Sequence, residues 1–134
     1  MSTETITTRT SVYSVRPDGI VVQRNLPGIV QSVSDAQENI AAFNKLADGR
    51  PRLLLVDTRE LEGQENGVRE IYAGEDAMRW AAAVAALSNT SGTGRVLINL
   101  FIALSRPLSP TRMFTSEDAA LAWLKKIGRL KKLG

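Results

Sequence analysis

The pattern of apolar positions near the start of the chain predicts an antiparallel hairpin. Two β-branched runs, at residues 12–15 and 20–22, flank a four-residue turn. Pro17 comes early in that turn and Gly19 comes last, which is a common arrangement in tight turns between strands. We therefore expect the first two elements to be paired antiparallel strands.

The next apolar positions predict a helix followed by a buried strand. Ser34 and Asp35 are suited to begin a helix that runs to Ala47, where Asp48 and the glycine after it end it. Its buried stripe recurs at spacings of four and three residues and comprises Ala36, Ile40, Phe43 and Ala47. Residues 53–56 are continuously apolar, which is typical of a strand covered on both faces of a sheet.

In the second half, alanine content and β-branching predict the elements. Residues 75–88 are rich in alanine, the best helix former, and are expected to be helical. The polar stretch 89–94 reads as a loop, and the apolar run 96–104 as a buried strand. A short strand is expected at 112–114, and a final amphipathic helix begins after the capping residue Ser116.

This order of elements predicts an α/β fold. Helices that separate apolar strands imply right-handed crossovers, and therefore a mixed, mostly parallel sheet edged by the N-terminal antiparallel hairpin, with helices packed on it. We expect one domain over residues 1–134, in which 1–10 fray and 129–134 form a basic tail.

The composition restricts the chemistry that the chain can perform. It contains no histidine and no cysteine, which excludes thiol nucleophiles, imidazole bases and His/Cys zinc sites. The acidic set Glu60, Glu62 and Glu65 has the oxygen ligands that Mg²⁺ prefers, but a solvated loop is the favoured interpretation. We expect a protein that is not an enzyme and that has no cofactor and no metal.

Charge and hydropathy restrict the partners and the location. The net charge of +3 comes from the last fourteen residues, which carry five cations and no acid. We interpret this tail as a solvated helix end, because a nucleic-acid surface needs a broader basic face with interleaved aromatic side chains. No apolar run is long enough to span a membrane, and the polar N-terminus lacks the core of a secretory signal. Cytoplasmic location and no nucleic-acid partner are expected.

Residues 53–59, 99–107 and 112–124 resemble a known family, the uncharacterised bacterial STAS/SEC14-like or SpoIIAA-like proteins. The most specific part is Phe114 followed by an acidic helix start and the Trp123-Leu124 pair. The resemblance covers about residues 52–124 and implies the fold of anti-sigma-factor antagonists or Sec14-type lipid carriers, a tendency to form homodimers, and no established reaction. Antagonists of this fold carry a phosphorylated serine in an Asp-Ser-Ser-Gly-like sequence; here Asp57-Thr58 stands there and Thr58 is the only nearby hydroxyl.

Five residues are candidates for binding, and four of them have a structural alternative. Asp57, at the end of a strand, suits a phosphoacceptor or a turn carboxylate bound to Arg59 or Arg106. Thr58 is the candidate hydroxyl for a phosphoswitch. Asn99 interrupts an apolar strand and either contacts a ligand or bonds across the sheet. Arg106 and Arg112 flank a proline-containing loop and suit either a carboxylate or phosphate ligand or structural ion pairs.

The interface candidates are Met78, Ala82 and Ala85, which form an apolar strip on the expected helix 75–88, and Trp80 as an aromatic anchor. The leading hypothesis is a noncatalytic regulatory or binding module that contacts a protein partner, as a homodimer, through this surface. The alternative is a carrier or sensor of a small apolar or acidic ligand, because alanine side chains leave volume between the sheet and a helix. A third hypothesis is an enzyme that uses Asp57 and a metal.

Overall fold

A computed structural model describes residues 4–133 of the chain. Its strands are β1 (Thr5–Thr7), β2 (Ser11–Val15), β3 (Val21–Asn25), β4 (Val30–Gln31), β5 (Arg52–Asp57), β6 (Gly63–Gln64), β7 (Ala81–Leu87) and β8 (Thr111–Phe114). Its helices are α1 (Val33–Ala47), α2 (Val68–Ala73), α3 (Glu75–Met78), α4 (Thr93–Ser105) and α5 (Glu117–Leu130).

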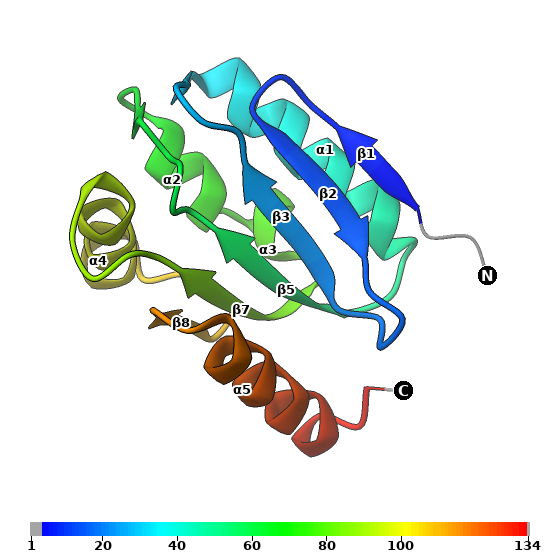
Figure 1. Cartoon of the computed structure of the whole chain (residues 1–134). Helices are drawn as coiled ribbons and strands as arrows, with labels where there is room; N and C mark the ends of the chain where they lie inside the picture. Colours follow the sequence, from blue (N-terminus) through cyan, green and yellow to red (C-terminus); the bar gives the residue numbers. More distant parts are fainter. Residues whose placement is uncertain (1–3, 134) are drawn as a thin grey trace.

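One six-stranded sheet in the order β1-β2-β3-β5-β7-β8 forms the centre of the molecule (Figure 1). The N-terminal strands β1, β2 and β3 are antiparallel, whereas β3–β5, β5–β7 and β7–β8 pair in parallel. Strands β4 and β6 form a separate parallel pair. The predicted fold class, a mixed and mostly parallel α/β sheet with an N-terminal hairpin, is confirmed.

The hairpin turn forms as the sequence predicts. Gly19 takes a φ of 87°, and its N–H donates to the carbonyl oxygen of Arg16 at 2.8 Å. The carboxylate of Asp18 accepts the backbone N–H of Ile20 at 3.2 Å, so the side chain of the turn fixes the first residue that follows it. The turn thereby sets the register Val15↔Val21 of the two strands.

Helix α1 begins two residues earlier than expected. Its cap is Ser32, whose side chain accepts the N–H of Asp35 while the Asp35 carboxylate accepts the N–H of Ser32. Asp35 is therefore the reciprocal partner of a capping box and not part of the cap itself. The end of α1 is as predicted, since Asp48 adopts a left-handed conformation directly after Ala47.

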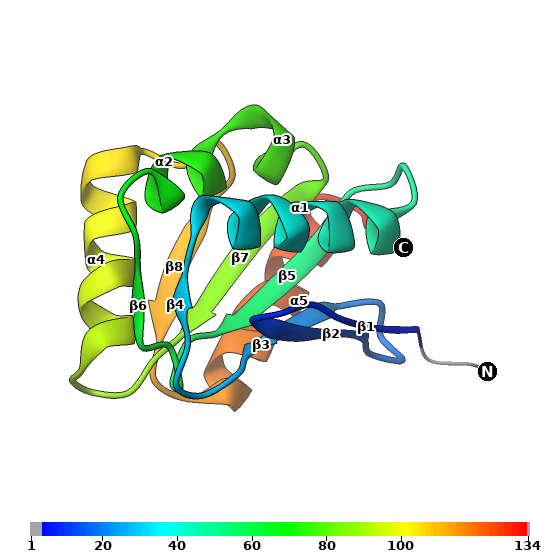
Figure 2. The ribbon, with the colours of Figure 1, turned by 90° about the horizontal axis from the view of Figure 1, so that it is seen from above.

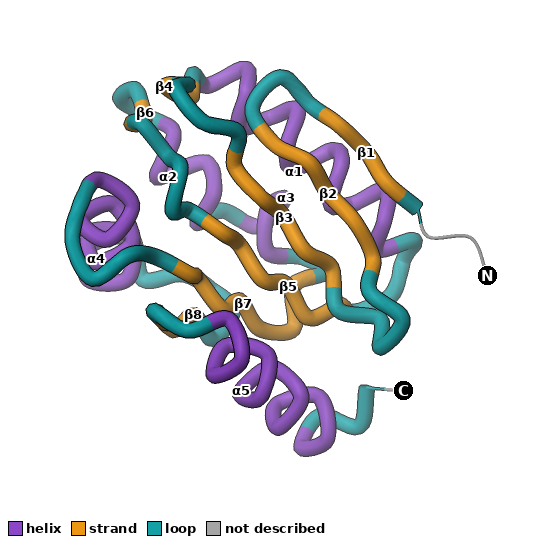
Figure 3. The backbone as a smooth tube through the Cα atoms, viewed as in Figure 1, coloured by secondary structure: helices purple, strands orange, loops and turns teal. Residues whose placement is uncertain are grey.

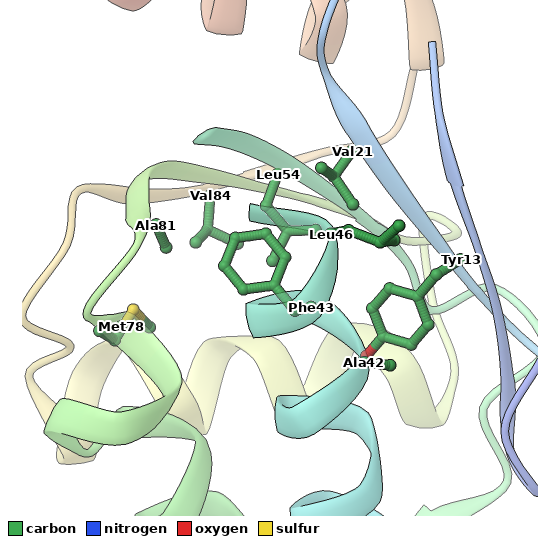
Figure 4. Packing of buried hydrophobic residues seen from close by; sticks show 9 residues of the cluster. All are labelled: Tyr13, Val21, Ala42, Phe43, Leu46, Leu54, Met78, Ala81 and Val84. Atoms are coloured by element: carbon green, nitrogen blue, oxygen red, sulfur yellow. The ribbon is translucent and has the colours of Figure 1, made fainter. Parts of the chain in front are cut away.

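The sheet has helices on both faces. Helices α1, α2 and α3 lie on one face, α4 stands beside the β8 end of that face, and α5 lies on the opposite face (Figures 1 and 2). Alternation along β3 sends Val21 to the α1 face and Val22 to the α5 face, so this strand contributes to both cores. Figure 4 shows Phe43, Leu46 and Tyr13 packed between α1 and the sheet.

Two elements of the second half are the reverse of what the sequence predicts, as Figure 3 makes plain. The predicted helix 75–88 is wrong beyond Met78, because residues 81–87 form the inner strand β7. The predicted strand 96–104 is also wrong, because it lies within helix α4. Tertiary packing decides both cases: β7 lies between β5 and β8 with both faces covered, where small side chains let the helices approach closely.

The remaining elements are mixed in outcome. Strand β8 and helix α5 with its Ser116 cap are confirmed. Strands β1, β4 and β6 and helix α2 were not predicted. Residues 5–10 were expected to fray, yet β1 pairs with β2 and Thr10 is buried; residues 1–3 of that expectation lie outside the described part of the chain. Among residues 4–133, no helix combines the length and apolar character that crossing a bilayer requires.

Candidate functional site

A cavity of about 120 Å³ lies between the sheet and the helices α1–α4. Strands β2, β3, β5 and β7 supply side chains to its floor, and the rest of the lining comes from all four helices, from β4, β6 and β8, and from the segment after β5. Helix α5, on the other face, contributes none of the described lining residues. The cavity is therefore a property of one face of the sheet.

Most of the lining is apolar. Phe43 of α1, Leu54 of β5 and Val84 of β7 meet Ile98 and Phe101 of α4 around it. The strand β7 also presents alanine to the cavity, at positions 81 and 86, where a larger side chain would fill the space. The small residues that the sequence suggested would leave volume do so, although they do it from a strand and not from a helix.

One end of the cavity is polar because β3 alternates. Gln23 and Asn25 follow Val21 on the same face of the strand, and they are 6% and 7% exposed. The Oδ1 atom of Asn25 accepts from Ser11 Oγ at 2.9 Å, from Gln31 Nε2 at 3.4 Å and from Gln23 Nε2 at 3.5 Å. These contacts join three carboxamide groups into one cluster.

The cluster continues toward α1 and α2. Gln31 Oε1 accepts from Gln64 Nε2 at 3.1 Å and from the Tyr72 hydroxyl at 3.3 Å. Asn39 of α1 donates to the Tyr72 hydroxyl at 3.0 Å and to Thr10 Oγ1 at 2.9 Å. Such a network of hydrogen-bonded neutral groups holds its members in fixed orientations.

The electrostatics of the cavity favour uncharged contents. None of the described residues that line it is an aspartate, glutamate, lysine or arginine. Burial raises the pKa of Tyr72 to about 12, and burial raises the pKa of Tyr13 well above its ordinary value, so both phenols are neutral at physiological pH. An ion in this cavity would lose hydration without gaining a counter-charge.

Asp57 lies outside the cavity, in a cluster of ion pairs at the carboxyl end of β5. Arg59 approaches its carboxylate at 2.8 Å and Arg24 at 2.9 Å, and Arg24 also pairs with Glu117 at 3.0 Å. Burial alone would raise the pKa of Asp57, but hydrogen bonds from Arg59 and Arg24 outweigh it and lower that pKa. The turn-carboxylate alternative fits this arrangement, with Arg59 as an anticipated partner and Arg24 as an unanticipated one.

Thr58 is buried, and its hydroxyl is already engaged in a hydrogen bond. Its hydroxyl donates to the carbonyl oxygen of Leu87 at 2.8 Å, and its backbone N–H donates to the same oxygen at 2.8 Å. Gly94 of α4 presses against it so closely that an added Cβ would lie 2.6 Å from Thr58 Oγ1. Thr58 does line the cavity, but its hydroxyl is held by the sheet.

The other binding candidates are scattered over the surface. Asn99 was expected to be a buried amide in a strand; it is exposed on α4, so that prediction is wrong. Arg106 is the exposed residue that ends α4 in a left-handed conformation. Arg112 lies over the ring of Phe114, with its guanidinium carbon 5.2 Å from the ring centroid. The structure does not bring these three residues together with Asp57.

The predicted interface strip does not exist as a surface. Ala85 is fully buried on β7 and Met78 is buried in the core beside α1, so neither is available to a partner. Trp80 and Ala82 are half-buried, and Trp80 packs against the same core. The strip was predicted for a helix that the chain does not form. Among the described residues, no group of three or more acidic side chains is placed to hold a metal ion.

The sequence analysis missed the polar end of the cavity. One signal was available: Gln23 and Asn25 extend a β-branched strand at every second position, so both belong to one face of the sheet. Asn39 likewise shares a face of α1 with the buried Phe43, four residues later. Amides on a face that must be buried indicate either a network or a ligand.

Comparison with known families decides the classification. A family model described as "Domain of unknown function (DUF7793)" matches residues 13–128. The chain belongs to this family. A search of curated proteins found no match to this DUF7793 member.

A solved structure shows the same fold as the DUF7793 chain. It is an uncharacterized protein of the DUF3478 family with a SpoIIAA-like fold from Shewanella loihica PV-4. The two are 14% identical, 92% of each chain is covered, and the TM-score is 0.59. The predicted resemblance to SpoIIAA-like proteins is therefore confirmed at the level of the fold.

Proposed function

We propose that this DUF7793 protein is a noncatalytic module that binds a small, uncharged, mainly apolar molecule in the cavity between the sheet and α1–α4. The cavity itself carries the proposal. Protein interiors are close-packed, so a volume of about 120 Å³ that is lined mainly by apolar side chains, between a sheet and the helices that cover it, is the feature expected of a small-molecule site.

Size and polarity define the molecule that fits. An engineered protein cavity of about 150 Å³ takes up benzene, so this one, of about 120 Å³, suits a molecule, or the part of one that enters it, with about five or six non-hydrogen atoms. The neutral lining supports the apolar half of the alternative derived from the sequence and speaks against an acidic ligand. Binding here requires no bond to be made or broken, consistent with a chain that has no imidazole and no thiol.

The test is whether filling the cavity removes binding. Ala86→Leu places a larger side chain in the cavity, and Ala122→Leu makes the same change at an exposed position of α5. Titration of the ¹⁵N-labelled protein with benzene should shift amide signals of cavity residues in the wild type and in Ala122→Leu, and not in Ala86→Leu. Native mass spectrometry of protein purified from its host should show a bound mass. Benzene shifts that survive Ala86→Leu, or no binding in any variant, would contradict the proposal.

A second candidate function, contact with another protein, rests on the outer face of α4. Val96, Leu100 and Leu104 recur every fourth residue and are 57%, 41% and 64% exposed. Three large apolar side chains in a row on one helix face are more than scattered surface residues. The resemblance to SpoIIAA-like proteins suggests a second copy of the chain as the partner.

Helix α4 also connects the two candidate functions. Leu97, Ile98 and Phe101 on its inner face line the cavity, directly beside the exposed row. A regulatory partner bound to the outer face would therefore sense a change in the cavity through one helix. Sedimentation equilibrium should show a dimer that the double change Leu100→Glu and Leu104→Glu dissociates and that Asn99→Glu, an exposed position of the same helix, leaves intact. A wild-type monomer at every concentration would remove this candidate.

A further inference from the structure

Among the cavity amides that are more than nine-tenths buried, two atoms have no hydrogen-bond partner within residues 4–133. They are the Nδ2 donor of Asn25 and the Oε1 acceptor of Gln23, which belong to side chains more than nine-tenths buried. Neither atom is among those that protein completely encloses without a partner. Since both residues line the cavity, these atoms are left to whatever occupies it.

The surrounding network fixes which atom of each amide is left over. Asn25 Oδ1 already accepts from Ser11, Gln23 and Gln31, so the amide must present its NH₂ group elsewhere. Gln23 uses its NH₂ group toward Ser11 Oγ at 3.4 Å and Asn25 Oδ1 at 3.5 Å, which leaves its carbonyl oxygen. The orientation of each amide is therefore set by hydrogen-bonding partners on β2 and β4 and not by the ligand.

The two free atoms form a pair with opposite roles. Positions 23 and 25 point to the same face of β3, and the two side chains are in direct contact. A ligand that satisfies both must offer an acceptor to Asn25 and a donor to Gln23 side by side. A cis amide edge, as in a lactam or a cyclic imide, and a primary amide both have this arrangement in a neutral group.

We propose that the cavity selects ligands that carry an uncharged amide or lactam group, bound between Asn25 Nδ2 and Gln23 Oε1, with the apolar remainder directed toward Phe43, Leu54 and Phe101. This inference rests on the proposed function and specifies its ligand class. A ligand without the donor would leave the Gln23 carbonyl oxygen buried and unpaired, which lowers affinity by a factor of about ten or more.

Three probes of similar size separate the two levels of the proposal. Benzene offers no polar group, cyclohexanone offers only an acceptor, and 2-piperidone offers an adjacent acceptor and donor. We expect the wild type, followed by ¹⁵N-resolved titration, to bind 2-piperidone at least about tenfold more tightly than cyclohexanone. Equal affinity for the two, with benzene still bound, would overturn the amide inference alone. No binding of any probe would overturn the proposed function as well.

Matched variants place the selectivity on the named pair. Gln23→Met keeps the length of the side chain and removes the acceptor, while Gln64→Met makes the same change at another glutamine of the cavity. Gln23→Met should reduce the preference for 2-piperidone over cyclohexanone to about one, whereas Gln64→Met should keep the preference. A preference that is lost in Gln64→Met and kept in Gln23→Met would overturn the assignment. The wild-type probe series decides the ligand class even if a variant does not fold.

Discussion

Replacing Gly94 with alanine tests how closely α4 is seated on the sheet. The added Cβ would lie 2.5 Å from the carbonyl oxygen of Thr58, 2.6 Å from its Oγ1 and 3.2 Å from its Cβ. The nearest of these atoms belongs to the backbone at the end of β5, and the hydroxyl is held by its bond to Leu87. Neither can move without disturbing the sheet, so α4 itself must shift outward.

The size of the effect follows from two opposing contributions. Overpacking at such a contact costs about 1–3 kcal/mol, whereas alanine in a helix gains at most about 1 kcal/mol over glycine. We expect Gly94→Ala to lower the free energy of unfolding by about 1–2 kcal/mol, which moves the urea midpoint down by roughly 0.5–1 M. Because Ile98 and Phe101 of α4 line the cavity, the same variant should also weaken benzene binding.

Gly128 of α5 offers a matched control. An added Cβ there would lie 3.0 Å from Leu53 Cδ1, the end of a flexible side chain that can turn aside. Gly128→Ala should therefore leave stability within about 0.5 kcal/mol of the wild type or raise it slightly, because the propensity gain compensates the small shift. If Gly94→Ala proves as stable as Gly128→Ala in urea unfolding followed by circular dichroism, the close seating of α4 is refuted.

Three further predictions concern single polar groups. The hydrogen bond from Arg9 is the main reason that the pKa of Asp35 is lowered, so the stability it contributes is present at neutral pH and lost as pH falls below about 4. Asp35→Asn should cost about 1–2 kcal/mol at pH 7 and flatten acid unfolding; an unchanged acid profile would contradict this. Thr58→Val should cost about 1 kcal/mol in urea unfolding, since the backbone N–H still pairs with the Leu87 carbonyl, and a loss above about 3 kcal/mol would point to a larger role. Glu117→Gln breaks a half-exposed ion pair and should change thermal stability by less than about 1 kcal/mol, whereas unfolding of the variant at room temperature would show a buried role.

The hairpin, the first helix, the strand β5 and the last helix could be predicted because local and tertiary preferences agree there. The turn 16–19 needs glycine where φ is positive, and α5 has both a serine cap and acidic residues in its first turn. Such signals are short in range, and nothing in the rest of the fold opposes them. The fold class followed because the order of these elements allows few sheet topologies.

The segment that forms β7 was predicted as a helix and the segment that forms α4 as a strand, because each has a local preference that packing overrides. Alanine favours a helix, yet residues 81–87 lie inside the sheet, where the hydrogen bonds of β5 and β8 on either side outweigh propensity. The run 96–104 is apolar on both the buried and the exposed side of α4, so its helical period is hidden. Its nine residues exceed the usual length of a buried strand, which was the available indication of a helix.

The polar end of the cavity was not predicted, for a related physical reason. Charged residues such as Asp57 and Arg112 are obvious site candidates in a sequence. In the structure Asp57 is held by an ion pair with a neighbouring arginine, and Arg112 lies over a neighbouring aromatic ring. The amides Gln23 and Asn25, which line the cavity, each carry a polar atom with no hydrogen-bond partner among the described residues. Their importance depends on which face of the sheet α1 covers, and that is a long-range property.

The inner strand β7 has consequences for how this lineage can vary. Ala83 and Ala85 meet α5 with no exposed surface, so substitution there by anything bulkier would push a whole helix away. Ala81 and Ala86 instead border open volume. Larger side chains can therefore be accommodated only on the cavity side of this strand. Each such substitution would reduce the volume left for a ligand and pack the interior more tightly.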